Sequence, residues 1–267
     1  MKLHPILGLM LLVVSTPSEA YDPQHLKRFE QTGSCENCDL NYVHIIGFSA
    51  ENANLKGVKL REAEFKEARL LAADFEKADL RHSNLEKAQL MGSQMYAALL
   101  RGADLEKADL RGANLNEADL READLEEVNL ENATLVGADL RGALLKRARL
   151  DGADLSSSKI MYVILERASL NGARLANARL EGTHLRRTQL RQADLRGANL
   201  SGANLSRADL TGADLKGANL SDAGLYLADL SSADLRETSG LNQETLGRAC
   251  GNAETMLPKG LSVPACR

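Results

Sequence analysis

Residues 193–217 read ADLRG-ANLSG-ANLSR-ADLTG-ADLKG, a five-residue unit that recurs without a break. The same unit extends in both directions, and every residue whose number is a multiple of five from Leu40 to Leu235 is a repeat centre. Nearly all of these centres are Leu, and the residue two positions earlier is nearly always Ala. A small residue and a large apolar residue therefore recur together every five residues, in a register that no insertion interrupts.

This spacing excludes both a regular helix and a straight strand. Five residues advance an α-helix by about 500°, so successive Leu side chains would spread over every face. On a continuous strand an odd period sends successive Leu side chains to opposite sides. Only a chain that bends once per repeat keeps them together. We expect Ala and Leu to share one side of a short extended segment, and the other two residues to form the bend, where Gly is common at the second position.

The pattern resembles the pentapeptide repeat family, whose consensus is Ala-Asp/Asn-Leu-x-x. The resemblance covers residues 40–235 of the 267. It implies an all-β fold, a right-handed quadrilateral parallel β-helix with four repeats per coil, Leu in its centre and Ala beside it. Forty repeats then make about ten coils. Each coil of such a solenoid needs its neighbours, so we expect short helical caps at the two ends.

The chain before the repeat divides into two predicted segments. Residues 1–20 read as a secretory signal peptide, with Lys2, a short apolar run and a small-x-small cleavage site ending at Ala20. That run is too short to span a bilayer, and no segment of the mature chain is a transmembrane candidate. Residues 21–39 are expected to hold an N-terminal capping helix, which begins at Asp22 and stops at Gly33, followed by a Cys-x-x-Cys sequence.

The β-helix is predicted over 40–238 and a C-terminal cap over 239–267. In the cap, Asn242 can begin a helix that runs through Arg248, and an extended tail follows. The ending resembles the C-terminal segment of many exported bacterial pentapeptide repeat proteins. The resemblance implies a bacterial envelope protein, located in the periplasm or secreted.

Four cysteines lie outside the regular repeats, which suits an oxidising compartment. On that basis we expect two disulfides, Cys35 with Cys38 and Cys250 with Cys266. For the first pair, a free thiol pair and a metal site stay open as alternatives. A thioredoxin-like redox site would need a βαβ context that the repeat lacks, and zinc would need two further ligands nearby.

No pattern in the chain indicates an enzyme. The five His are scattered, and HExxH, GxSxG, a phosphate-binding loop and GxGxxG after a strand are all missing. The many Asp residues are the consensus residue before Leu, not paired catalytic carboxylates. We therefore predict no catalytic residue, no cofactor and no metal ligand.

Four repeats per coil would place residues twenty apart directly above one another. One column then holds five arginines and a neighbouring column holds Glu86, Glu106 and Glu126; the arginines are Arg61, Arg81, Arg101, Arg121 and Arg141. Like charges about 5 Å apart repel. We expect the arginines to pair sideways with carboxylates such as Glu62 or Glu122.

Charge is uneven along the chain, although the total is only −4 and selects no partner. Residues 101–131 carry ten acidic and four basic residues, and residues 167–207 carry two acidic and eight basic ones. The basic zone, with Arg186, Arg187 and Arg191, is expected to touch an acidic partner. Apolar residues also replace the consensus locally, and we expect a contact patch for a partner or for a homodimer. They are Leu144, Met161, Tyr162 and Ile164.

These features favour a non-enzymatic exported protein, a rigid scaffold for protein–protein or surface interaction. Its partner would be an unknown envelope protein or an anionic surface. The alternative is a DNA mimic that protects type II topoisomerase, as some members of the family do. That function needs a cytoplasmic and strongly acidic dimer, whereas this chain has a signal-like start and a basic zone. Nucleic acid is not expected as a partner, because aromatic residues for stacking on bases are few.

Overall fold

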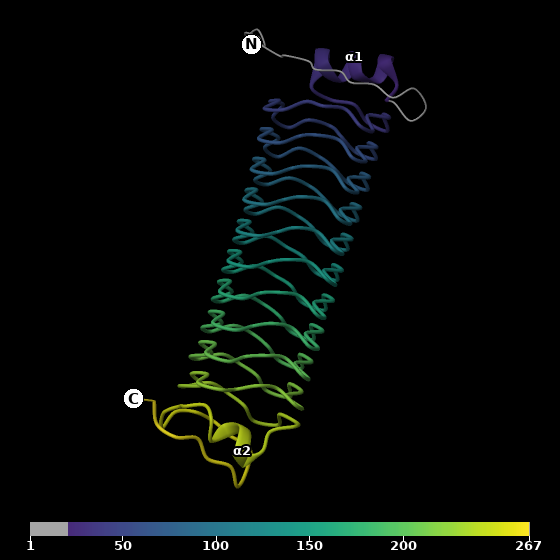
Figure 1. Ribbon diagram of the computed structural model, residues 1–267. Helices are drawn as coiled ribbons and strands as arrows, with labels where there is room; N and C mark the ends of the chain where they lie inside the picture. Colours follow the sequence, from purple (N-terminus) through teal and green to yellow (C-terminus); the bar gives the residue numbers. More distant parts are fainter. Residues whose placement is uncertain (1–20, 267) are drawn as a thin grey trace.

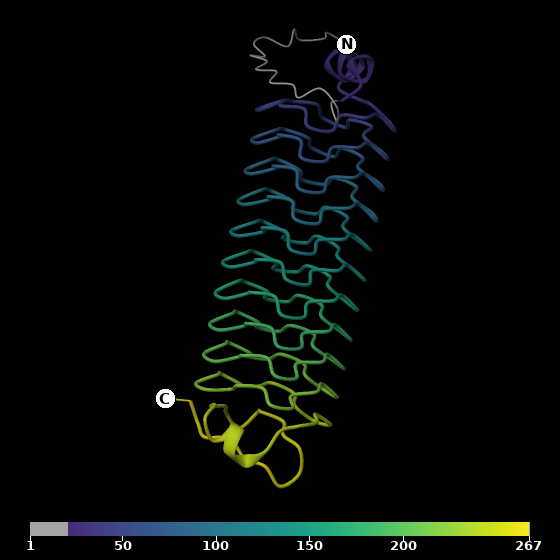
Figure 2. The same ribbon diagram turned by 45° about the vertical axis from the view of Figure 1, so that its right-hand side comes forward.

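The computed structural model describes residues 21–266 as a straight rod of stacked coils with the chain ends at opposite tips (Figures 1 and 2). Every repeat has the same local form, a short extended segment followed by a tight turn. In one of them the Ala108 N–H donates to the Leu105 carbonyl at 3.0 Å, which closes a four-residue turn. The third residue of each turn has positive φ, whether it is Gly102 at 66° or Lys107 at 59°. This is the conformation that a type II turn requires.

The coils stack through parallel backbone pairing with a register of twenty residues. Asp104 bridges Asp124, for example, and the Leu105 N–H donates to the Asp124 carbonyl at 2.7 Å. From the other side the Asp104 N–H donates to the Ser83 carbonyl at 2.9 Å. One coil therefore takes four repeats, and residues twenty apart do lie above one another, as the family resemblance implied.

We name the four sides of the rod by their buried centres. Side A holds residue 40 and every twentieth residue after it, side B begins at residue 45, side C at 50 and side D at 55. The two-residue turns form corners AB, BC, CD and DA between them. Side B therefore lies opposite side D, and corners AB and BC are its two edges.

The core is a set of Leu columns with Ala beside them. Leu120 and Ala118 are fully buried, like almost every residue at their two positions. Full burial of each Leu contributes roughly 1.5–3 kcal/mol before entropy is subtracted. Most of the small hydroxyl residues that replace Ala donate to nearby carbonyls, as Thr183 does to Ile160 at 2.8 Å. The interior therefore remains packed where the consensus changes.

Helix α1, Pro23–Thr32, lies across the first coil (Figure 1). The Asp22 carboxylate accepts from the Gln24 N–H at 2.8 Å, and Gly33 ends the helix in the left-handed conformation. The Phe29 ring is buried with its centre 4.5 Å from that of Phe48. The helix thus covers the apolar interior at the N-terminal end of the rod.

Helix α2, Gln243–Leu246, is shorter than the helix expected from Asn242 to Arg248. Asn242 begins it as predicted, with its side chain accepting from the Thr245 N–H at 2.9 Å. The chain then joins the last coil: the Arg248 carbonyl accepts from Leu227, and Cys250 bridges Asp229. This extended backbone is incompatible with a helix, so the helix ends at Leu246.

The cysteines form two disulfides, Cys35–Cys38 beside α1 and Cys250–Cys266 beyond α2, and no cysteine in the described chain is free. The predicted signal peptide lies outside the described residues. Among residues 21–266, no helix has the length and apolar character needed to cross a membrane.

Candidate interaction surface

The structure brings six of the seven binding-patch candidates to one side of the rod. Leu144 and Ile164 are stacked on side B, where they bridge each other in parallel. The other four flank them at the edges of that side: Met161 and Tyr162 on corner AB, Arg186 and Arg187 on corner BC. We call side B with these two corners, from residue 104 to residue 207, the contact side.

Arg191 is separated from Arg186 and Arg187, because five residues carry the chain around a quarter of a coil. It lies on corner CD, where its Nε donates to Asp209 Oδ2 at 2.5 Å. Its backbone N–H donates to Asn171 Oδ1 at 3.1 Å. Arg191 is thus engaged within the chain and does not belong to the contact side.

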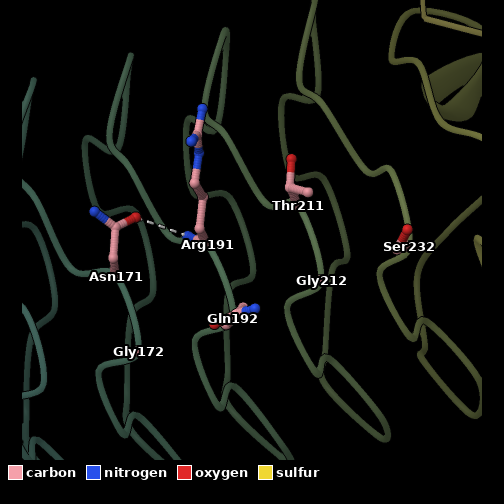
Figure 3. A pocket seen from close by; sticks show the side chains of 7 residues that line it. All are labelled: Asn171, Gly172, Arg191, Gln192, Thr211, Gly212 and Ser232. Carbon is pink, nitrogen blue, oxygen red and sulfur yellow. Dashed lines mark hydrogen bonds between the residues drawn. The ribbon is translucent and has the colours of Figure 1, made fainter.

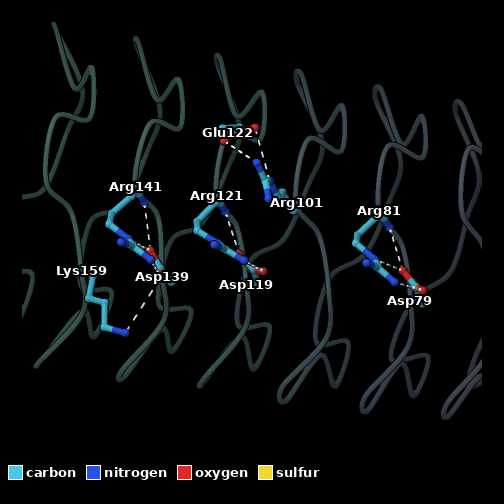
Figure 4. Close-up of polar contacts among 9 residues, drawn as sticks. All are labelled: Asp79, Arg81, Arg101, Asp119, Arg121, Glu122, Asp139, Arg141 and Lys159. Carbon is cyan, nitrogen blue, oxygen red and sulfur yellow. Dashed lines mark hydrogen bonds and ion pairs between the residues drawn. The ribbon is translucent and has the colours of Figure 1, made fainter.

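Arginines on corner AB are neutralised by carboxylates of the same chain (Figure 4). Arg81, Arg121 and Arg141 each bind the Asp two residues earlier on side A, and Arg121 Nη2 lies 2.6 Å from Asp119 Oδ2. Arg101 instead binds Glu122 at 2.8 Å. The prediction that this column pairs sideways is confirmed. Hydrogen bonding from Arg121 lowers the pKa of Asp119, and exposed pairs of this kind stabilise the fold only weakly.

Most charges of corner BC are also neutralised in its N-terminal half. Glu86 binds Lys66 one coil before it and Lys87 beside it, with Lys87 Nζ 2.7 Å from Glu86 Oε1. The hydrogen bond from Lys66 and then that from Lys87 lower the pKa of Glu86 to about 2.

This shift predicts a pH-dependent contribution of Glu86 to stability. Because its pKa in the folded protein is depressed, the contribution is complete above about pH 4.5 and is lost as the pH falls towards 2. We expect the melting temperature of Glu86→Gln to lie slightly below that of the wild type at pH 6, and to converge with it at pH 2. Thermal melts followed by circular dichroism across this range would measure the difference. A gap that stays constant with pH would contradict the expectation, and Glu62→Gln, at a carboxylate without an ion pair in the described chain, is the matched control.

The C-terminal half of corner BC is different, because its charges lack partners. Arg147 binds Glu127 at 3.1 Å, but the other charged residues of this corner past residue 120 make no ion pair within residues 21–266. They are Glu126, Lys146, Glu166, Arg167, Arg186, Arg187 and Arg207. The Arg186 guanidinium, then desolvation, then Arg167 and Arg207 lower the pKa of Arg187. Positive charge is therefore concentrated here without compensation.

The apolar part of the contact side is equally unusual. Tyr162 is 73% exposed, the largest value among the exposed large hydrophobic residues of the described chain. Its ring lies beside Gly182 in the next coil, where an added Cβ would come within 2.7 Å of Tyr162 Cε1. Leu144 and Ile164, partly exposed, occupy positions where the consensus has Asp or Asn. Outward apolar groups in such a cluster are typical of a contact surface.

A shallow hollow on corner CD was not predicted from the sequence (Figure 3). Its volume is about 600 Å³, and it is lined by Asn171, Gly172, Arg191, Gln192, Thr211, Gly212 and Ser232. It forms because Gly172 and Gly212, one coil to either side of Gln192, lack side chains. The sequence does contain a signal for this hollow, namely two Gly that are forty residues apart in the same turn column. The hollow is open, and the one cation among its lining residues, Arg191, is already bound to Asp209.

Potential metal ligands in the described chain meet at one place. One oxygen of Asp229 and the sulfurs of Cys250 and Cys266 lie within 4.8 Å of one another. The two sulfurs are joined to each other, and those of Cys35 and Cys38 are joined likewise, so none is a thiolate. Of the three alternatives for Cys35 and Cys38, the structure contains the disulfide.

A comparison with family models finds pentapeptide repeats in eight copies, in matched stretches that run from residue 34 to residue 239 with a short gap after residue 160. The chain belongs to the pentapeptide repeat family. Pentapeptide repeat proteins fold as right-handed quadrilateral β-helices, in agreement with the four-sided coils seen here. A comparison with curated proteins finds no match.

Solved structures similar to this pentapeptide repeat protein belong to the same family. HetL from the cyanobacterium Nostoc, involved in heterocyst differentiation regulation, is 33% identical; the alignment covers 86% of this chain and 97% of HetL, with a TM-score of 0.39. QnrB1, a plasmid-mediated fluoroquinolone resistance protein, is 21% identical, with 78% and 94% covered and a TM-score of 0.40. The family assignment rests on the repeat match, and these superpositions add no argument about function.

Proposed function

We propose that this pentapeptide repeat protein is an exported, non-enzymatic interaction scaffold that binds a partner through its contact side. One observation carries the proposal: unpaired charges and outward apolar groups collect on the same side of the rod. Outside corner BC the arginines of the coils bind carboxylates of their own chain, as Arg121 and Arg196 do. A surface that leaves its charges unpaired is one that a partner can neutralise.

Rigidity suits the rod to this function. Each coil is held by backbone hydrogen bonds on all four sides, and about ten coils with a helical cap at each end would form one stiff body. The partner is an envelope protein or an anionic surface. Export to the periplasm or beyond is supported by the signal-like residues 1–20 and by the two disulfides, which persist in oxidising compartments.

A DNA mimic receives less support from the surface. Such a protein would need acidic columns along its length. On corner BC the carboxylates of Glu86, Glu106 and Glu126 give way to Arg186, and the adjoining column carries Arg167, Arg187 and Arg207. This half of the rod would repel a site that binds the DNA phosphate backbone.

Photo-crosslinking in the native host tests the scaffold function. A photoreactive residue at Tyr162, in the full precursor, is expected to give a specific protein adduct in fractionated cells. The same residue at Val136, which is 37% exposed on corner DA, is the matched control and should give none. Equal adducts from both positions, or no adduct from Tyr162 in a correctly exported protein, would contradict a function of the contact side.

A further inference from the structure

We propose that the contact side binds a second copy of this chain in an antiparallel dimer, with a two-fold axis between Leu144 and Ile164. The inference rests on the proposed function, because it takes the contact side to be an interaction surface and identifies its occupant. Neither the family match nor the similar structures assign this surface.

The symmetry fixes which coils meet. A two-fold axis that lies in the interface and crosses the rod at a right angle reverses the direction of the second rod. It also keeps corner AB opposite corner AB and corner BC opposite corner BC. Coils at equal distances from the axis then face each other: residue 144 meets 164, residue 124 meets 184 and residue 104 meets 204. Six coils contact in this way, and at ~4.8 Å per coil they extend over about 24 Å.

Apolar groups lie at the centre of this dimer. Leu144 meets Ile164 of the second copy, and the symmetry repeats the contact on the other side of the axis. Tyr162 faces Gly142 of the second copy, a position that has no side chain and leaves room for the exposed ring. Leu144 and Ile164, the two apolar residues at the outward position of side B, thus lie at the centre of the interface, where the symmetry buries each of them in both copies.

The unpaired charges become complementary in the same arrangement. Glu126 faces Arg186 of the second copy, and Lys146 faces Glu166 of the second copy. Glu127, which binds Arg147 in its own chain, faces Arg187 of the second copy. Each contact occurs twice. Arg187, crowded by other arginines within its own chain, gains carboxylates opposite it. The apolar centre sets the position of the two-fold axis, and that position determines all of these charge pairings.

Two contacts bring like charges together. Lys107 faces Arg207 of the second copy, and Arg147 faces Arg167 of the second copy. In each, one cation is already neutralised in its own chain: Lys107 binds Glu106 and Arg147 binds Glu127. A parallel dimer, with its two-fold axis along the rod, would place corner BC against corner AB. Arg186 and Arg187 would then face Glu181, which already binds Arg179, and Lys146 would face Arg141. A foreign acidic partner would use the basic half alone and leave Glu126 unmatched. The charge pattern therefore favours a second copy in the antiparallel direction.

A charge swap between two variants tests the arrangement on the purified mature protein. The first variant carries Glu126→Arg and Glu127→Arg, and the second carries Arg186→Glu and Arg187→Glu. In each homodimer both ends of the interface become repulsive. Sedimentation velocity should therefore show a dimer dissociation constant at least about 100-fold higher than that of the wild type. In the mixed dimer both ends are attractive, so mixing the two variants should restore the dimer.

The control variant, Arg174→Glu with Arg196→Glu, has the same charge change as the second variant but lies on side D and corner DA. It should dimerise like the wild type. A wild type that is monomeric throughout the concentration range, or a mixture of the two variants that stays monomeric, would overturn the proposal. Circular dichroism of each variant establishes that the rod is folded.

The crosslinking experiment separates failure of the dimer from failure of the scaffold function. A self-adduct at Tyr162 supports both. An adduct with a different envelope protein alone supports the scaffold function and overturns the dimer as the occupant of the contact side. No adduct overturns the scaffold function, while sedimentation still decides whether the purified rods pair.

Discussion

Replacing Leu100 with Ala is expected to lower the free energy of unfolding by about 3–5 kcal/mol. Leu100 is fully buried in the side A column, and neighbouring coils hold Leu80 and Leu120 at the same position. The backbone there is fixed by hydrogen bonds to the coils on either side, including Leu100 N–H to the Asp119 carbonyl at 2.8 Å. The coil cannot collapse around the cavity, so the lost buried area and the lost contacts both lower the free energy of unfolding.

The adjacent residue provides a matched control. Leu99 has the same side chain but points outward and is 36% exposed, so Leu99→Ala should cost less than about 1 kcal/mol. Denaturant unfolding would compare the two variants, and amide hydrogen exchange would locate the effect. In a solenoid the protection should fall in the coils next to residue 100 and persist at α1. Similar losses for both variants would contradict the assignment of inward and outward columns.

Replacing Gly240 with Ala is expected to destabilise the junction between the last coil and the C-terminal segment by about 3 kcal/mol. Gly240 has a φ of 79°, and a Cβ there would overlap the backbone N and Cα of Ser221. Left-handed strain contributes about 1–2 kcal/mol, and displacing the Ser221 backbone adds a similar amount. Exchange of the Leu220 amide, which donates to the Ser239 carbonyl at 2.8 Å, should become about 100-fold faster.

Gly260→Ala separates the two contributions. Gly260 has a φ of 83°, but nothing lies within 4 Å of an added Cβ, so only the conformational strain of about 1–2 kcal/mol applies. Equal effects of the two substitutions would mean that the backbone near Ser221 gives way, and that the close approach at Gly240 does not hold the C-terminal segment in place.

The buried columns could be predicted from the sequence because the period itself excludes other folds. The turn conformation was predictable only in part. Gly102 suits a positive φ. Lys107 and Arg187 adopt it too, although this backbone conformation is unfavourable for residues with a side chain. Their backbone N–H groups donate to the next coil, as Lys107 does to Glu126 at 2.9 Å, and this stacking overrides the local preference.

The contact side was predictable residue by residue but not as a surface. Arg186 and Arg191 are close in sequence and lie on different corners, whereas Leu144 and Ile164 are distant in sequence and bridge each other on side B. The unpaired state of corner BC could not be predicted, because several carboxylates were within reach of each arginine along the chain. The early end of α2 depended on pairing between Cys250 and Asp229, which the sequence pattern beyond the repeats does not encode.

The twenty-residue register also sets the order in which the molecule can assemble. In the regular coils the backbone hydrogen bonds between coils join residues only 19 or 21 positions apart, as between Leu105 and Asp124 or between Asp104 and Ser83. A chain that emerges with its N-terminus first therefore finds the template for each new coil already folded. α1 covers the first coil at the start, and only the Cys250–Cys266 closure awaits the end of the chain. The rod can grow vectorially, with about one coil of unfolded backbone exposed at any moment.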